Sequence, residues 1–243
     1  MKNADLIHVG TSGWHYEHWK GPFYPSECSA DRFLEYYAEH FHTVEINNSF
    51  YHLPAKETLN GWYNTVPADF IFAVKASRYI THMKKLKDPV KTLLPLLNRV
   101  EGLRDKLGPI LFQLPPNWKI NIKRLELFLK ELPKEHRYAF EFRDTSWFDN
   151  SIYEILQEHD AAFCIYHLAG TLSPKRVTSN TVYVRLHGPG DAYQGQYDSQ
   201  TLAGWVGAFS AWSRQGRHVY CYFDNDESGY APQDALRLQP MLD

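Results

Sequence analysis

The chain has 243 residues, of which 44% are hydrophobic and 22% are charged, and its formal net charge is -2. This length and composition fit one large α/β domain or two small ones, with an ample apolar core. A charge this close to zero excludes recruitment of nucleic acid or an anionic membrane by bulk charge, although a local basic pocket is compatible with it.

The cysteines and the hydropathy of the chain predict a cytoplasmic protein. Cys28, Cys164 and Cys221 are odd in number and lack C-x-x-C spacing, and the last two lie in apolar runs, which is typical of reduced, buried thiols. No apolar run approaches the roughly 18 residues that span a bilayer. Because the N-terminal residues lead directly into a predicted strand, we expect no signal peptide and no membrane association.

Alternating apolar and polar residues predict eight β-strands, since successive side chains of a strand point to opposite faces. Apolar residues at helical spacing predict a helix after nearly every strand. The predicted strands are residues 6–12, 43–47, 70–76, 110–114, 137–143, 161–166, 181–188 and 217–223. The predicted helices are residues 30–40, 56–64, 89–104, 121–132 and 151–159, one that follows Asp198, and a short last helix.

A few residues set the expected boundaries of these helices. Ser29 and Asn121 are suitable N-caps. Pro95 inside the third predicted helix implies a kink or a later start. Pro232 suits the first position of the last helix. Residues 168–180 show no helical periodicity, so we expect the sixth helix to be degraded or missing.

The alternation of strands and helices predicts an α/β fold with parallel strands. Eight such units in about 250 residues match the TIM (β/α)8 barrel. No linker or low-complexity segment interrupts residues 1–243, so we predict a single TIM-barrel domain. A doubly wound open sheet is the alternative, but its strands would be apolar on both faces, whereas these are polar on one.

The polar face of each predicted strand should point into the barrel, and active sites of this fold lie at the C-terminal ends of the strands. In the sixth predicted strand, either Tyr166 or His167 could face inward. The last inward residues of the other strands are polar: Ser12, Glu45, Asn47, Lys75, Gln113, Glu141, Arg143, Arg185, His187 and Asp224. They predict a ligand site. A structural network of ion pairs is the alternative, although burying so many charges without a ligand is costly.

The predicted ligand is anionic and carries a ring. Lys75, Arg143 and Arg185 are its candidate anion contacts, because Arg favours planar, bidentate partners such as carboxylate and phosphate. Rings in the loops could stack on a sugar or a base, or could simply pack: Trp14, Phe50, Tyr51, Trp147, Tyr193 and Tyr197. A sugar phosphate, a nucleotide or a strand end of nucleic acid would fit this set.

The carboxylates suggest acid/base chemistry. Glu45 and Glu141 are the candidate general acid/base pair, since burial and neighbouring charges push two pKa values apart. His187 could transfer a proton or only hydrogen-bond in the core. We predict no cofactor. A divalent metal held by Glu45, Glu141, His187 and Asp224, as in some barrel phosphodiesterases, is the alternative, but no typical metal-binding spacing supports it.

These residues leave several functions open. The first is an enzyme, with a hydrolase as its candidate class, that acts on an anionic sugar or nucleotide-like substrate. The second is a non-catalytic module that binds nucleotide or nucleic acid, and the third is a structural barrel whose charges are internally paired. The sequence indicates no oligomeric state.

Several short motifs occur together along nearly the whole chain. They are Gly10-Thr11-Ser12-Gly13-Trp14, Val44-Glu45-Ile46-Asn47 with Ser49-Phe50-Tyr51, Phe72-x-Val74-Lys75 with Thr81-His82, Phe112-Gln113-Leu114-Pro115-Pro116, Glu141-Phe142-Arg143 with Ser146-Trp147, Arg185-x-His187-Gly188, and Tyr222-Phe223-Asp224-Asn225. This combination resembles the YecE-like family, known as domain of unknown function seventy-two. The resemblance implies a TIM-barrel fold and no established reaction. The family usually has Asn where this chain has Asp224, so the chain carries an additional carboxylate there.

Overall fold

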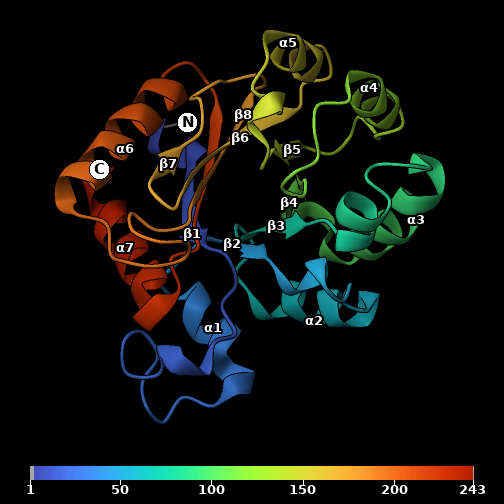
Figure 1. Ribbon diagram of the computed structural model, residues 1–243. Coiled ribbons are helices and arrows are strands. Elements are labelled where there is room, and N and C mark those ends of the chain that lie inside the picture. The colour runs from blue at the N-terminus through green and yellow to red at the C-terminus, as the bar shows by residue number, and fades with distance from the viewer. Residues whose placement is uncertain (1–2, 243) are drawn as a thin grey trace. The chain divides into compact units, whose positions relative to one another are not determined.

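The computed structural model describes residues 3–242, which alternate between strands and helices (Figure 1). The strands are β1 (Ile7–Thr11), β2 (Thr43–Ile46), β3 (Ile71–Lys75), β4 (Leu107–Gln113), β5 (Tyr138–Glu141), β6 (Ala162–Leu168), β7 (Thr171–Leu172), β8 (Thr181–Leu186) and β9 (His218–Phe223). The α-helices are α1 (Phe33–Ala38), α2 (Lys56–Thr65), α3 (Pro89–Val100), α4 (Ile122–Lys130), α5 (Asn150–Glu158), α6 (Ser199–Ser213) and α7 (Tyr230–Leu238). Short helical turns lie in the loops, among them η3 (Ala30–Arg32), η4 (Asn48–Phe50), η5 (Tyr79–Met83) and η6 (Glu101–Lys106).

The order of the hydrogen-bonded strands is β1-β9-β8-β6-β5-β4-β3-β2, with β7 beside β6. The pairs β1·β9, β8·β9, β3·β4, β4·β5 and β5·β6 are parallel. A parallel bridge between Ser12 and Glu45 joins the ends of β1 and β2. This is the connectivity of the TIM-type (β/α)8 fold, so the predicted fold class is confirmed.

The chain forms two compact units, and each is described by itself. Unit 1 comprises the described residues up to Glu45 together with Ile165–Lys175 and the described part of the chain from Asn180 onward. Unit 2 comprises Ile46–Cys164 and Arg176–Ser179. The single domain predicted for the whole chain stays a prediction.

In unit 1, helices α6 and α7 pack against β9, and α7 also packs against β1 (Figure 1). Every residue of β8 is buried, which is typical of a parallel strand covered on both faces. Gly10 is required where β1 approaches β2, because a Cβ at this position would lie 2.2 Å from the carbonyl oxygen of Thr43. This close approach places Ser12 opposite Glu45.

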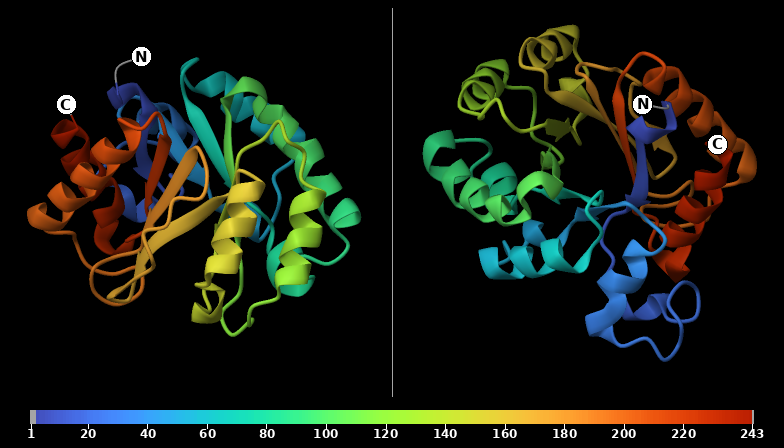
Figure 2. Two further views of the ribbon diagram at one scale, coloured as in Figure 1. Left: turned by 90° about the horizontal axis from the view of Figure 1, so that it is seen from above. Right: turned by 180° about the vertical axis from the view of Figure 1, so that it is seen from behind.

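In unit 2, β3, β4, β5 and the first residues of β6 lie side by side, and α4 packs next to α5 (Figure 2). Phenylalanine rings fill the space under α4: Phe112 lies 5.2 Å from Phe140 and 5.0 Å from Phe128 between ring centroids. The other parity of the same strands carries Gln113 and Glu141, which are register partners. The alternation predicted for these strands therefore separates an apolar layer from polar ends.

A hairpin replaces the sixth helix. After β6 the chain turns at Ala169 and Gly170, which have φ values of +48° and +71°, and β7 pairs antiparallel with β6. Residues 173–178 then continue with no regular structure until β8 begins at Thr181. The predicted loss of this helix is confirmed.

Some predicted helix boundaries are confirmed and others are wrong. Asn121 caps α4 by accepting a hydrogen bond of 3.0 Å from the backbone N–H of Arg124. Ser29 makes no capping hydrogen bond, and the turn η3 precedes α1. Helix α3 begins at Pro89 and continues past Pro95, so a later start is wrong. Helix α7 begins at Tyr230, before Pro232.

Among residues 3–242, no helix is long and apolar enough to cross a membrane.

Candidate functional site

Unit 1 contains a cluster of buried polar side chains at the C-terminal ends of its strands. We call it the buried network; it consists of Ser12, Glu45, Tyr183, Arg185, His187 and Asp224. Asp224, at 7%, is the most exposed of the six, and four of the others have no exposed surface at all. All but Tyr183 are site residues predicted from strand parity, so the fold brings these predicted residues together.

Glu45 is held by three donors. Its Oε1 accepts hydrogen bonds from Ser12 Oγ at 2.5 Å and from Arg185 Nη2 at 2.7 Å, and its Oε2 accepts one from Tyr183 Oη at 2.7 Å. Burial, together with the charge of Glu45, raises the pKa of Tyr183 well above its ordinary value, so the phenol keeps the proton that it donates. The carboxylate of Glu45 is therefore fixed in position.

Arg185 balances two buried carboxylates. Besides Glu45, its Nη2 contacts Asp224 Oδ2 at 3.1 Å, and its side chain has no exposed surface. An isolated charge at such a depth would be very costly, whereas a hydrogen-bonded set of opposite charges is tolerated. In this structure Arg185 therefore neutralises charges inside unit 1.

His187 is oriented by Asp224. Its Nδ1 lies 2.9 Å from Asp224 Oδ2, and its Nε2 lies 3.4 Å from Arg185 Nη1. Because a guanidinium can only donate, Nε2 is assigned as the acceptor, and Nδ1 then carries the proton that is donated to Asp224. Asp224 and Arg185 together therefore hold the imidazole in one orientation and one tautomer.

Two tyrosine rings enclose His187. Tyr193 and Tyr166 meet its ring edge-on, at centroid distances of 5.4 Å and 6.4 Å. Tyr166 is thus the residue of β6 that faces the network. Its neighbour His167 instead contacts Tyr197 Oη at 3.1 Å through Nδ1, and its pKa is lowered, first by burial and then by His187.

Unit 2 contains a second group of the predicted residues, at the ends of three adjacent strands. Lys75 ends β3, Gln113 ends β4, and Glu141 ends β5, with Arg143 two residues further on. We call these four residues the strand-end cluster. Glu141 is fully buried and forms an ion pair with Arg143 Nε, which fixes the plane of the guanidinium. Cys164 Sγ lies 3.9 Å from the other oxygen of Glu141.

Two loop residues adjoin the strand-end cluster. Lys75 Nζ lies 4.4 Å from the centroid of the Phe50 ring, and the His82 ring meets Phe50 edge-on at 5.0 Å. Burial, followed by the positive charges of Lys75, Arg78 and Arg143, lowers the pKa of His82 to about 4. His82 is therefore neutral at pH 7 and lies in an electropositive environment.

Strand parity did not predict a role for His82, because this residue lies in a loop after β3. Its one signal in the sequence was the pair Thr81-His82 in the motif set that resembles the YecE-like family. Thr81 Oγ1 lies 2.9 Å from His82 Nδ1, which holds the imidazole in place.

The other predicted residues occupy different environments. Trp147 is fully buried, stacks on Phe142 at 4.9 Å and donates a hydrogen bond to the carbonyl of Trp118, so it forms part of the core of unit 2. Trp14 is 6% exposed, whereas Tyr51 and Tyr193 are 74% and 44% exposed. Asn47 Oδ1 is buried and has no hydrogen-bond partner within the described chain.

A cavity of about 690 Å³ lies beside Tyr193 in unit 1. It is lined by His18, Pro22, Ala192, Tyr193, Gln194, Asp226, Glu227 and Ser228. Burial raises the pKa of Asp226, although Trp19 Nε1 donates a hydrogen bond to it. Over residues 3–242, no three His, Cys, Asp or Glu side chains converge in a way that could hold a metal ion.

Comparison with known proteins identifies the family. Residues 8–243 match the family described as protein of unknown function DUF72. The UPF0759 protein YunF of Bacillus subtilis is 26% identical, over 98% of this chain and 95% of that protein. The UPF0759 protein YecE of Escherichia coli K12 is 30% identical, over 59% of this chain and 50% of that protein. The crystal structure of the DUF72 family protein TM1631 from Thermotoga maritima superposes with a TM-score of 0.88 at 29% identity, covering 97% of this chain and 98% of that one. The chain described here belongs to the DUF72 family.

Proposed function

We propose that the protein is an enzyme that acts on an anionic, ring-bearing substrate by general acid/base catalysis. The observation that carries this proposal is the strand-end cluster of unit 2. There two cations, Lys75 and Arg143, lie with a buried carboxylate, Glu141, at the C-terminal ends of parallel strands. Active sites of (β/α)8 folds are built at these strand ends.

In this proposal Lys75 and Arg143 bind a phosphate or carboxylate of the substrate. The contact with Glu141 holds Arg143 in one orientation, and preorganised donors of this kind favour negative charge as it develops in a transition state. The imidazole of His82, which is neutral at pH 7, lies in the same positive environment and can donate a hydrogen bond to the anion. Glu141 is the proposed acid/base group.

The buried network of unit 1 is considered by itself and contains a second candidate for proton transfer. His187 is held by Asp224, which is the arrangement used to orient a catalytic histidine. Glu45 and Arg185 are proposed to fix this pair in place, because Arg185 contacts Asp224 and His187 and is itself bonded to Glu45. We also propose a cytoplasmic location, because Cys164 and Cys221 are buried free thiols, as is typical of proteins in a reducing compartment.

The test is turnover on a panel of phosphomonoesters, phosphodiesters and glycosides. On any substrate found, Glu141→Gln and Lys75→Met should each lower kcat/KM by about 100-fold or more, the range of a lost general acid/base or charge contact. Lys130→Met and Glu158→Gln, which replace exposed residues of the same unit, are the controls and should keep the rate. Wild-type rates in both active-site variants would refute the assignment.

The full burial of Glu45 and Glu141 favours a second candidate, a module that binds the same anionic ligands without chemistry. Binding and turnover distinguish the two functions. If the protein binds phosphate-bearing ligands and Glu141→Gln leaves their affinity unchanged, while no member of the panel is converted, the binding module is correct and the enzyme is not.

A further inference from the structure

The loop after β3 is the most basic segment of the chain. Residues 78–91 comprise this loop and the first three residues of α3, and we call them the basic loop. They contain five cations (Arg78, Lys84, Lys85, Lys87 and Lys91) and one carboxylate (Asp88), although the chain as a whole carries a net charge of -2. Four of the five cations are exposed to solvent, and Lys84 is partly exposed. The basic loop is therefore a local concentration of positive charge in a chain whose net charge is slightly negative.

The backbone of the basic loop is held in an unusual conformation. Its first residues form the π-helix η5, and three non-glycine residues follow with positive φ: Lys85 at +47°, Leu86 at +61° and Asp88 at +51°. Such conformations cost of order 1 kcal/mol or more each and persist only where surrounding contacts impose them. Single-turn π segments and strained residues are both concentrated at functional sites.

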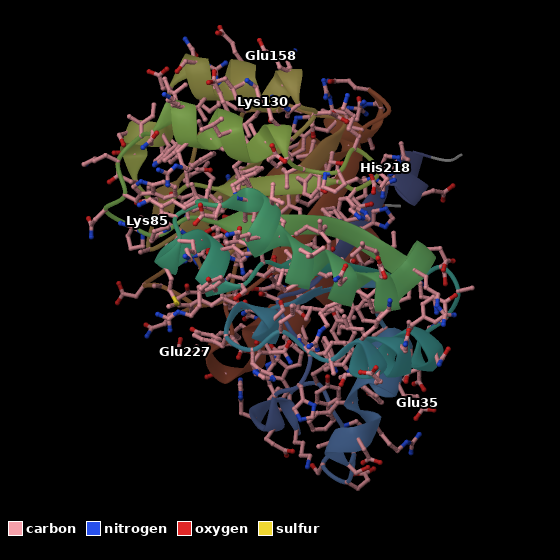
Figure 3. The ribbon with its side chains drawn as sticks, turned by 90° about the vertical axis from the view of Figure 1, so that its right-hand side faces the viewer. Glu35, Lys85, Lys130, Glu158, His218 and Glu227 are labelled. Atoms are coloured by element: carbon pink, nitrogen blue, oxygen red, sulfur yellow. The ribbon has the colours of Figure 1, made fainter. Side chains whose placement is uncertain are left out.

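The contacts that impose this conformation are clear. Leu86 is fully buried, and its backbone N–H donates to the carbonyl of Ile80 at 3.0 Å. Arg124, at the start of α4, donates to the carbonyl of Lys85 at 3.2 Å. With Leu86 turned inward, Lys85 and Lys87 point outward on either side of it. Figure 3 shows Lys85 at the edge of the view, well apart from Lys130.

A row of rings connects the surface with the interior of unit 2. Tyr51 is 74% exposed and meets Phe50 edge-on at 5.0 Å, and Phe50 in turn contacts His82 and Lys75. Tyr79 in η5 is 45% exposed, and Lys84 Nζ lies 5.7 Å from its ring centroid. Exposed rings interleaved with lysines are the combination that binds single-stranded nucleic acid, in which bases stack and phosphates pair with cations.

We propose that the basic loop, with Tyr51 and Tyr79, binds a single-stranded nucleic acid and directs one of its phosphates to Lys75 and Arg143. This inference rests on the proposed anion contacts of the strand-end cluster and names their substrate class. An anionic membrane surface would also attract the lysines. It would not explain the cations below them, however, because Lys75 is only 8% exposed and a bilayer is too broad to reach it.

The experiment measures binding of a fluorescent single-stranded oligodeoxynucleotide of about twelve nucleotides, which lies within the usual site size. Affinity is followed by anisotropy between about 50 and 200 mM salt for the wild type and two double variants. K85Q/K87Q removes two exposed lysines of the basic loop, and K130Q/K134Q removes two exposed lysines that precede β5, at the opposite end of the parallel strands. Thermal denaturation confirms that both variants fold.

We expect only the double variant of the basic loop to lose affinity for the oligonucleotide. K85Q/K87Q should bind at least about tenfold more weakly at the lower salt concentration, and the slope of log affinity against log salt should fall by about 1.4, at about 0.7 per phosphate contact. K130Q/K134Q should bind like the wild type. Equal losses in both variants, or an oligonucleotide affinity no greater than that of a mononucleotide, would overturn the inference. Binding to phosphatidylserine vesicles without binding to the oligonucleotide would also overturn it.

Failure here is distinct from failure of the proposed function. Suppose that K85Q/K87Q and the wild type turn over a small phosphoester equally and that neither binds the oligonucleotide. The proposed active site is then supported, and the proposal of a nucleic-acid substrate is refuted. If the oligonucleotide binds as expected and Glu141→Gln changes no rate, nucleic-acid binding by the basic loop is supported and the role of Glu141 as acid/base group is refuted.

Discussion

At the scale of single residues, His82 reports the electrostatic potential of the strand-end cluster. Its pKa of about 4 reflects burial first and then the charges of Lys75, Arg78 and Arg143. Since the unfolded imidazole has an ordinary pKa near 6.5, folding disfavours protonation. The contribution of His82 to stability is therefore fully present above the ordinary value and is lost as the pH falls toward 4.

We expect Lys75→Met to raise the pKa of His82, because a like charge is removed, and inorganic phosphate bound at the cluster to raise it as well. The measurement is an NMR titration of the His82 ring in the wild type, in Lys75→Met and in Lys130→Met as the control. A ring that titrates near the ordinary value in all three proteins would contradict the electropositive environment.

The free energy of unfolding should depend less on pH below pH 6.5 in His82→Gln than in the wild type.

Glu45 and Arg185 give a second prediction at this scale. Removing one partner of a buried ion pair leaves the other charge without compensation, at a cost of about 3–5 kcal/mol. Glu45→Gln and Arg185→Met should each lower the free energy of unfolding by about this amount, as measured by urea denaturation. The exposed pair Arg32–Glu35 is the matched control in the same unit, where Glu35→Gln should change stability by less than about 1 kcal/mol. Equal effects at the two pairs would contradict a structural role for the buried network.

At the scale of elements, the hairpin that replaces the sixth helix has an unfavourable turn residue. Ala169 and Gly170 both have positive φ, the requirement of a two-residue type I′ turn, for which Asn-Gly is the preferred sequence. Ala169→Asn should therefore raise the free energy of unfolding by about 0.5–1 kcal/mol, because asparagine tolerates this conformation better than alanine. Ala169→Val, with a β-branched side chain, should lower it. Denaturant titration of the three proteins tests both signs, and a stabilising valine would exclude the turn assignment.

The elements also show what strand parity can predict. Parity placed Ser12, Glu45, Arg185 and His187 on one face because the side-chain period of a strand leaves no other choice once the apolar face is known. It could not give the partners, since Arg185 meets Asp224 through the order of β8 and β9 in the sheet. Trp147 shows the opposite limit: an aromatic residue in a loop is equally compatible with stacking on a ligand and with packing in the core.

At the scale of the whole molecule, charge is distributed unevenly. The formal net charge of -2 predicts weak retention by a cation-exchange or heparin column at neutral pH. The basic loop predicts strong retention, because a protein surface binds through its local electrostatic potential and not through the net charge of the chain. We expect the wild type to be retained on heparin at low salt and K85Q/K87Q to elute earlier than K130Q/K134Q. Co-elution of the two variants would show that no local patch dominates.

The eight strands of the main order, the helix after nearly every one of them and the missing sixth helix could be predicted, because hydrophobic periodicity is a local property. The short strand β7, which pairs with β6, was not predicted. The basic loop could not be assigned a conformation from sequence. Lys85, Leu86 and Asp88 adopt positive φ values only because Leu86 is buried and Arg124 holds the neighbouring carbonyl, and both are contacts formed in the tertiary structure.

The connection that follows the hairpin has a consequence for proteolysis. Lys175 and Arg176 are exposed in the segment between β7 and β8, where the backbone has no regular structure and the side chains rest on the rings of Trp205 and Tyr153. Trypsin cleaves after lysine and arginine where the chain is exposed and can extend, whereas Lys85 of the basic loop is held at a positive φ of +47°. Native cleavage by trypsin is thus expected to begin at Lys175 or Arg176. Because an irregular connection lies where a helical crossover is usual, this segment is the expected first site of tryptic cleavage in the native protein.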